Sequence, residues 1–310
     1  MEPVRRIARG ERALRAGALV GASDGIVQRR DLRAAGVSRA DVRSEVSAGR
    51  WRADGIQSVV LHTGPLSERA LLWRAVWNSG SGAILDGVSA LHAAGLAGFR
   101  SDHIDVAIQA GRRPHPVDGV RLHLRRDLGP MVTTGLPRAR PEPAVVRAAQ
   151  WAVSDRQAVL LLCLVVQQRL VSHQRLLDAV SLLTRSRRRW LVGTVVADIC
   201  DGAHSLGELD FGQMCRARGL PGPSRQVVRT GAGGRVYLDV AWEDIGLVAE
   251  IDGGHHALAL NPVDDALRQN EIVLGGDRVL RVPVVGLRLA PERFLDQVVR
   301  AHRLLRRPAA

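Results

Sequence analysis

The stretch LVAEIDGGHH, residues 247–256, decides how the C-terminal third of the chain folds. Its apolar start predicts a buried strand, yet the strand carries Glu250 and Asp252. Residues at alternate positions of a strand lie on the same face, so both carboxylates share one face. A buried carboxylate is costly unless a partner offsets its charge. Either these acids lie at a strand end in water, or they share a cation.

The neighbouring sequence predicts a small mixed α+β domain around this strand. A turn signal, TGAGG, separates two strand-like runs, and Ser205 with Glu208 has the spacing of a helix capping box. The predicted order is helix, three strands, helix, strand, helix, at residues 205–220, 225–230, 235–242, 247–252, 264–274, 278–285 and 291–305.

Alternation within these strands predicts a cluster of acids. Asp239 lies on one face of its strand with Tyr237, and aligned neighbouring strands would bring it close to Glu250 and Asp252. Three like charges at one point require a counter-ion, and oxygen ligands favour Mg²⁺ or Mn²⁺ over zinc. A divalent ion beside a phosphodiester lowers the pKa of water and stabilises the leaving oxygen.

The ordered set of polar residues resembles the PD-(D/E)xK nuclease superfamily, and more closely its very-short-patch-repair-like endonuclease domains. The resemblance covers roughly residues 205 to 305 and implies a restriction-endonuclease-like domain. The residues that carry it are Glu208, Asp239, Glu250-Ile251-Asp252-Gly253, His255-His256, Asp265 through Arg268, Gly275 or Gly276, and Leu280-Arg281.

This resemblance implies roles for the acids. Asp239 and Glu250 would be metal ligands, and Glu208 would hold a water molecule or a second ion. Each acid also has a simpler interpretation: Glu208 as a capping residue and Asp239 as a strand-end acid in water. Glu250 is harder to explain without a partner, because apolar residues flank it.

The catalytic position that the wider superfamily fills with lysine is Asp252 here, and the chain contains no lysine. Arg268 would supply positive charge, although its high pKa makes it a poor base. His255 or His256 would transfer a proton near neutral pH. Simpler interpretations are a turn at Asp252-Gly253, loop histidines, and a surface ion pair between Asp265 and Arg268.

Charge is distributed unevenly along the 310 residues. The net charge is +13, and all 44 basic residues are arginine. Residues 201–310 contain 14 arginines and 14 acids, so residues 1–200 carry the whole excess. This division is typical of a polyanion-binding part joined to a cation-binding part, although arginine-rich codon usage also contributes.

The N-terminal 62 residues predict a winged helix-turn-helix. A short helix is expected over 25–35, Gly36 ends it, and Ser38 caps a second helix over 38–49. Asp54-Gly55 then predicts a hairpin. In this geometry the second helix lies in the major groove of DNA. Such folds also serve as protein interaction modules, and a small helical domain with a solvated arginine face is the simpler alternative.

Four arginines are the predicted DNA contacts. Arg39 and Arg43 lie on the polar face of the second helix, opposite Val42 and Val46, and would face DNA. The remaining two, Arg50 and Arg52, lie on the wing and would contact phosphate.

The order QRRDLRAAGVSRADVRSEVSAGRWRADGI (28–56), followed by SALHAAGL (89–96), resembles the AbiE-type antitoxin domain of abortive-infection systems. That family pairs a winged helix with a mixed α/β region. The division expected is 1–62, 63–200 and 201–310, with helices and strands mixed in the middle. Trp73 and Trp77 are expected in the core rather than as a platform for bases.

The sequence excludes several other classes. Cys163, Cys200 and Cys215 have no metal-binding spacing and predict buried thiols in a reducing compartment. The N-terminus lacks the apolar segment of a signal peptide, and the longest apolar run is too short to cross a bilayer. A cytoplasmic protein that acts on DNA, and not on membranes, is expected.

The function expected is Mg²⁺-dependent or Mn²⁺-dependent hydrolysis of DNA phosphodiesters in repair or defence. A second hypothesis is a non-catalytic DNA-binding regulator or antitoxin with a degenerate nuclease fold, supported by the missing lysine. A nuclease acting on RNA is a third. The sequence does not identify a toxin or repair partner, the recognised DNA or the oligomeric state.

Overall fold

The protein has a mixed α+β fold in a computed structural model that describes residues 7–183, 186, 188–200, 211–230, 236–252 and 278–306. The chain forms two compact units, Met1–Arg147 and Ala148–Ala310. Within the described ranges the strands make sheets of three, four and five strands. The predicted boundaries after residues 62 and 200 remain predictions.

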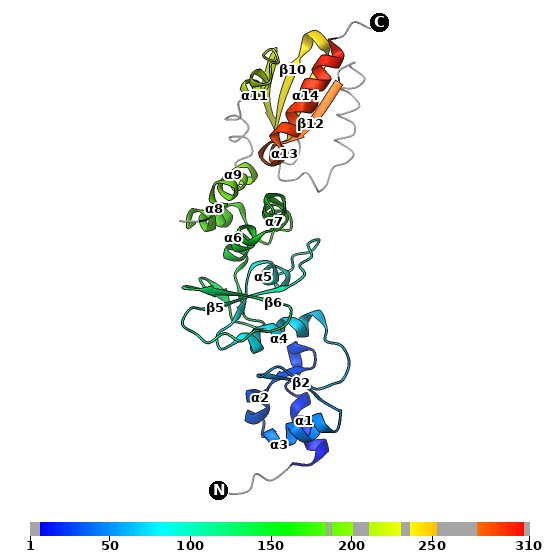
Figure 1. Ribbon diagram of the computed structural model, residues 1–310, viewed down its shortest axis with the longest axis vertical. Coiled ribbons are helices and arrows are strands. Elements are labelled where there is room, and N and C mark those ends of the chain that lie inside the picture. The colour runs from blue at the N-terminus through cyan, green and yellow to red at the C-terminus, as the bar shows by residue number, and fades with distance from the viewer. Residues whose placement is uncertain are drawn as a thin grey trace. The chain divides into compact units, whose positions relative to one another are not determined.

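The first unit begins with helices around a three-stranded sheet of order β1-β3-β2 and continues with a five-stranded sheet of order β6-β5-β4-β8-β7. Its described helices and strands are α1 (Arg9–Gly17), β1 (Ile26–Gln28), α2 (Arg29–Ala34), α3 (Arg39–Ser47), β2 (Arg52–Asp54), β3 (Ser58–Val60), α4 (Glu68–Ser79), β4 (Ile84–Leu85), α5 (Gly87–Ala93), β5 (Ile104–Gln109), β6 (Val120–Arg125), β7 (Met131–Val132), β8 (Arg138–Ala139) and, into the second unit, α6 (Pro141–Trp151). Figure 1 shows these elements in blue to green.

Capping by Ser38 explains where α3, the second helix of the predicted helix-turn-helix, begins. The hydroxyl of Ser38 accepts a hydrogen bond from the Asp41 amide, and the Asp41 carboxylate accepts one from the Ser38 amide. This capping box satisfies two amides that a helix end leaves without intrahelical partners. The predicted N-cap at Ser38 is confirmed, and Val42 is buried in the core as expected.

The helix predicted over residues 25–35 begins only at Arg29, so the prediction is wrong for residues 25–28. Ile26 and Val27 lie in strand β1, which pairs antiparallel with β3. Both side chains are buried, at 0% and 2% exposure, so pairing with a distant strand overrides the local pattern. The predicted hairpin at Asp54-Gly55 is confirmed, with a loop of residues 55–57.

The second unit contains a group of helices and a four-stranded sheet of order β12-β11-β10-β9. Its described elements, after α6, are α7 (Asp155–Gln167), α8 (His173–Ser181), α9 (Arg189–Cys200), α11 (Phe211–Ala217), β9 (Arg225–Thr230), β10 (Val236–Trp242), β11 (Leu247–Asp252), β12 (Arg278–Pro283), α13 (Val284–Leu289) and α14 (Pro291–Leu305). The helix predicted over 205–220 is described only as α11, and the one over 264–274 lies outside the described residues.

The four-stranded sheet has one apolar face covered by helices. Strands β9, β10 and β11 are antiparallel, and β12 joins β11 in parallel. Figure 1 shows helix α14 lying across strands of this sheet. The buried core between them includes Trp242, Ala249 and Ile251 from the sheet and Leu295 and Val298 from α14. This packing fixes which residues of each strand face away from the helices.

The buried side chain of His302 should make the stability of the protein depend on pH. Burial lowers its pKa below the usual 6.5, the charge of Arg306 lowers it further, and Asp244 opposes the shift. Its ring packs edge-on against Trp242, with the centroids 5.8 Å apart. Because the unfolded chain then binds more protons below about pH 6.5, the free energy of unfolding should decrease as the pH falls from about 7.5 to 5.5. Urea unfolding at several pH values measures this decrease.

The matched variant is His302→Phe, which keeps an aromatic ring without a titrating nitrogen. Its unfolding free energy should depend less steeply on pH over the same interval than that of the natural chain. Equal slopes for the two proteins would show that His302 does not contribute.

Candidate functional site

Two carboxylates face each other across the C-terminal sheet. The antiparallel register of β10 and β11 places Asp239 directly opposite Glu250. Opposite residues of an antiparallel pair lie on the same face of the sheet, with their Cβ atoms about 5 Å apart. Of the predicted cluster of three acids, the alignment of Asp239 with Glu250 is confirmed, and the roles of these residues remain predictions.

Both carboxylates are buried on the sheet face that lies away from the helix-covered core. Asp239 is 5% exposed and Glu250 is 2% exposed. Their strand neighbours Val240 and Ala249 belong to the core beneath α14, and alternation puts the two acids on the opposite face. Like charges directly opposite each other on two strands repel, so a positive charge beside this pair is favourable.

Arg281 supplies one such charge. The parallel register of β11 and β12 places Arg281 next to Glu250, and its Nε atom lies 3.6 Å from Glu250 Oε2. The Arg281 side chain is 41% exposed, whereas the Glu250 side chain is 3% exposed. One row across the sheet thus contains Asp239, Glu250 and Arg281, two negative charges and one positive.

The other predicted catalytic residues are described less completely. Asp252 is the last residue of β11, with its Cα opposite that of Tyr237. The remaining three, Glu208, His256 and Arg268, lie outside the described residues. Within the described ranges no group of three or more His, Cys, Asp or Glu side chains could hold a metal. The catalytic and metal-binding roles of Asp252, Glu208, His256 and Arg268 therefore remain predictions.

The donor set on this face fits a hard divalent cation. Asp239 and Glu250 provide carboxylate oxygens only, the ligands that Mg²⁺ and Mn²⁺ prefer. A Mg²⁺ site in proteins often uses one or two carboxylates and completes its shell with water and phosphate oxygens. Asp239 and Glu250 could supply the carboxylates of such a site.

A second charged surface lies on the N-terminal helices. Arg39 and Arg43 of α3 are both exposed, one helical turn apart. Partial burial lowers the pKa of Arg29, and the charges of Arg33 and Arg39 lower it further. The charges of Arg33 and Arg39 thus disfavour the charged form of Arg29, and an anion beside these groups would relieve the repulsion. We call Arg29, Arg33, Arg39 and Arg43 the basic face.

Only Arg39 and Arg43 of the basic face were predicted from the sequence. Arg29 and Arg33 belong to α2, whose beginning the sequence placed too early. The spacing of Arg29 and Arg33, four residues apart, was the available signal for a shared helix face.

The two arginines predicted on the wing make contacts within the protein. Arg50 Nε donates a 2.5 Å hydrogen bond to Glu45 Oε2, and this contact lowers the pKa of Glu45. Arg52 Nη1 donates to the carbonyl oxygens of Thr63 and Gly64, at 3.4 and 3.2 Å. Arg52 is exposed and presents its charge to solvent, whereas Arg50 offsets a buried carboxylate.

Neither Cys163 nor Cys215 is an activated nucleophile. All three are free thiols, and burial raises the pKa of Cys163 to about 11 and that of Cys215 to about 12. Both thiols are thus protonated near neutral pH, as is usual for buried cysteines in apolar surroundings.

No described helix is at once long and apolar enough to pass through a bilayer.

Comparison with known proteins gives a distant likeness to a solved structure. No protein-family model and no curated protein match the chain. A solved structure, that of the RV2827C protein from Mycobacterium tuberculosis, is 17% identical over 63% of this chain and 78% of that chain, with a TM-score of 0.41. A likeness at this level assigns neither a fold nor a function to this chain.

Proposed function

We propose that this protein is a Mg²⁺-dependent or Mn²⁺-dependent endonuclease that hydrolyses DNA phosphodiesters. The observation that supports the proposal is the register of β10 and β11, which holds Asp239 opposite Glu250 with both carboxylates buried. Two carboxylates side by side on one face of a sheet suit a site that binds a hard cation beside a phosphate.

Each residue of the row has a part in this function. Asp239 and Glu250 would hold the ion, which supplies an activated water nucleophile and stabilises the leaving oxygen. Arg281 contacts Glu250 and is partly exposed, so its guanidinium can turn toward a substrate phosphate. Glu208, Asp252, His256 and Arg268 belong to the same proposal through the family resemblance.

The N-terminal region is proposed to bind the DNA. The order of α2, α3 and the β2–β3 hairpin fits a winged helix-turn-helix, in which the second helix enters the major groove. The basic face would contact phosphates and base edges, and Arg52 would contact phosphate from the wing. In this proposal residues 1–62 bind, 63–200 connect, and 201–310, a restriction-endonuclease-like domain, cleave.

Conversion of supercoiled plasmid to nicked or linear DNA tests the proposal. The full-length protein should cleave with Mg²⁺ or Mn²⁺ and should not cleave with EDTA. A parallel assay with a structured RNA of similar length distinguishes a ribonuclease. Absence of cleavage of both nucleic acids with either metal would contradict the proposal.

A non-catalytic DNA-binding regulator is the second candidate. The ion pair between Arg281 and Glu250 favours this regulator. An arginine can neutralise the Glu250 carboxylate in place of a metal ion, but it does not activate water for hydrolysis. The absence of lysine from the whole chain agrees with this function. DNA binding that is unaffected by Mg²⁺, without cleavage, would select the regulator.

The basic face gives a prediction that both candidates share. The double variant Arg39→Gln/Arg43→Gln should bind duplex DNA roughly 10- to 100-fold more weakly, because two charged contacts are lost. If both contacts are to phosphate, the slope of log K against log salt should become shallower by about 1.8. Fluorescence anisotropy at several salt concentrations, with EDTA present, measures both quantities.

The matched control is Arg156→Gln on α7, which removes an exposed arginine far along the chain. Its affinity for DNA should stay within about twofold of the natural protein. An equal loss in the control would mean that total charge, and not the basic face, determines binding.

A further inference from the structure

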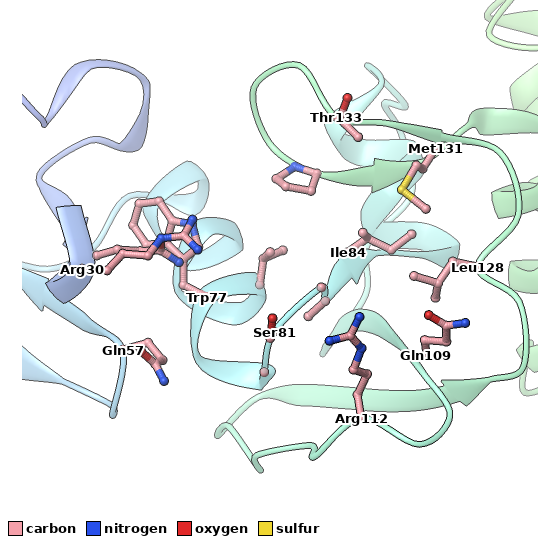
Figure 2. A pocket seen from close by; sticks show the side chains of 16 residues that line it. Arg30, Gln57, Trp77, Ser81, Ile84, Gln109, Arg112, Leu128, Met131 and Thr133 are labelled. Atoms are coloured by element: carbon pink, nitrogen blue, oxygen red, sulfur yellow. The ribbon is translucent and has the colours of Figure 1, made fainter. Parts of the chain in front are cut away.

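The first unit contains a pocket of about 500 Å³, within the range of small-molecule sites. Its wall includes Gln57 from the hairpin loop, Trp77 from α4 and Gln109 from β5. Figure 2 shows Arg30, Gln57 and Trp77 on one side of the pocket and Arg112 on the other. The floor is apolar and includes Ile84.

The charges that line this pocket are positive. Arg30 and Arg112 are its only ionisable lining residues among the described part of the chain. Arg30 lies 3.5 Å from Asp31, whose exposed carboxylate does not line the pocket. The Arg112 side chain makes no hydrogen bond or ion pair to any described residue. An anionic group between the two arginines would therefore be favourable.

Backbone packing fixes the loop that carries Arg112. A Cβ added to Gly80, at φ +133°, would lie 2.8 Å from the carbonyl oxygen of Arg113. The His115 amide also donates a 2.9 Å hydrogen bond to the Ser79 carbonyl. The loop after β5 is thus held closely against the end of α4, so Arg112 is presented at a defined place on the pocket rim.

An aromatic ring and several amides complete the wall. Trp77 is half-buried and packs against the buried Trp73, with ring centroids 4.8 Å apart. The side chains of Gln57 and Gln109 add amide groups to the wall. A planar ring with hydrogen-bonding edges would stack on the indole and satisfy amide groups.

We propose that this pocket binds a nucleoside monophosphate group. The phosphate would lie between Arg30 and Arg112, the base on Trp77, and the base edge with the amides of Gln57 or Gln109. The group is either a free nucleotide or an unpaired nucleotide of a nucleic-acid strand, because both present the same chemistry. The proposal uses none of the acids of the C-terminal sheet and stands without the proposed cleavage.

Two binding arms on the full-length protein test this proposal. Calorimetric titration with dAMP, dTMP, dGMP, dCMP and inorganic phosphate measures binding of free nucleotides. Fluorescence anisotropy in EDTA compares a duplex that contains one unpaired nucleotide with its fully paired counterpart. Binding of a free nucleotide more tightly than phosphate identifies the first source. No binding of free nucleotides, with an approximately tenfold preference for the unpaired duplex, identifies the second.

The decisive variant is Arg112→Gln, with Arg113→Gln as the matched control. Arg112 lines the pocket, whereas its exposed neighbour Arg113 does not. Arg112→Gln should weaken the observed binding, or the preference for the unpaired duplex, by about tenfold. Arg113→Gln should change either by less than about twofold.

Trp77→Leu is the second variant and should reduce the same signal, with its fold checked by circular dichroism. Retained circular dichroism with unchanged binding would remove the stacking role of Trp77. Two results overturn the proposal: no free-nucleotide binding together with equal affinity for both duplexes, or equal effects of Arg112→Gln and Arg113→Gln.

Discussion

Glu250→Gln is expected to reduce metal-dependent DNA cleavage on the order of 10³-fold, which is the largest effect on activity that the structure predicts. Glu250 lies at the centre of the row, opposite Asp239 and beside Arg281. Glutamine keeps the size of the side chain but removes the charge that would bind a hard cation in the proposed site. Asp239→Asn should have a similar effect for the same reason. Rates of plasmid nicking under single-turnover conditions measure the loss.

The control for these variants is Asp244→Asn, the same chemical change in the turn between β10 and β11. Asp244 is exposed and lies in the turn, away from the paired acids. It should retain cleavage within about twofold. Thermal unfolding with and without Mg²⁺ adds a readout independent of activity: the ion should stabilise the natural protein and Asp244→Asn, but not Asp239→Asn. Cleavage by Glu250→Gln at the natural rate would remove Glu250 from the site.

The C-terminal strands could be predicted because their signals are local. Alternating apolar residues, a glycine-rich turn and a proline at the first helical position define β10, β11 and α14 without distant partners. The hairpin between β10 and β11 sets the register that brings Asp239 opposite Glu250. A pairing specified by adjacent segments is accessible from sequence, so the two acids could be placed together.

The missed features depend on contacts between distant segments. Ile26 and Val27 form a strand only because β3 pairs with them. Arg281 reaches Glu250 through a parallel pairing whose two strands are separated by residues 253–277, and no hairpin specifies that register. The pocket is likewise built from segments between residues 28 and 137. Trp77 was expected in the core, and its position on the pocket wall follows from this tertiary arrangement.

Arg147→Met is expected to destabilise the first unit by about 3–5 kcal/mol, the largest effect on stability. Arg147 Nη1 donates a 2.7 Å hydrogen bond to Asp86 Oδ2, and its Nη2 donates to the Leu128 carbonyl at 2.7 Å. The Asp86 side chain is completely buried and also accepts from the Gly87 amide at the start of α5. Removal of the arginine would leave this carboxylate without its charged partner.

The control and the compensating variant separate this ion pair from general effects of substitution. Arg140→Met replaces an exposed arginine just before α6 and should change the free energy of unfolding by less than about 0.5 kcal/mol. The double variant Asp86→Asn/Arg147→Met should be more stable than Arg147→Met alone, because asparagine keeps the cap on α5 without a buried charge. Urea unfolding followed by circular dichroism measures all three.

The stability difference between Arg147→Met and the natural protein should also depend on pH, in a direction that the pKa of Asp86 determines. Burial raises the pKa of Asp86, and the charge of Arg147 opposes that shift. Without Arg147 the pKa rises further, so the folded variant takes up a proton at a higher pH than the unfolded chain. Protonation removes the buried charge, and the stability of Arg147→Met relative to the natural protein should therefore improve between about pH 8 and pH 5. A difference that stays constant or widens toward low pH would show that an uncompensated Asp86 charge is not the cause.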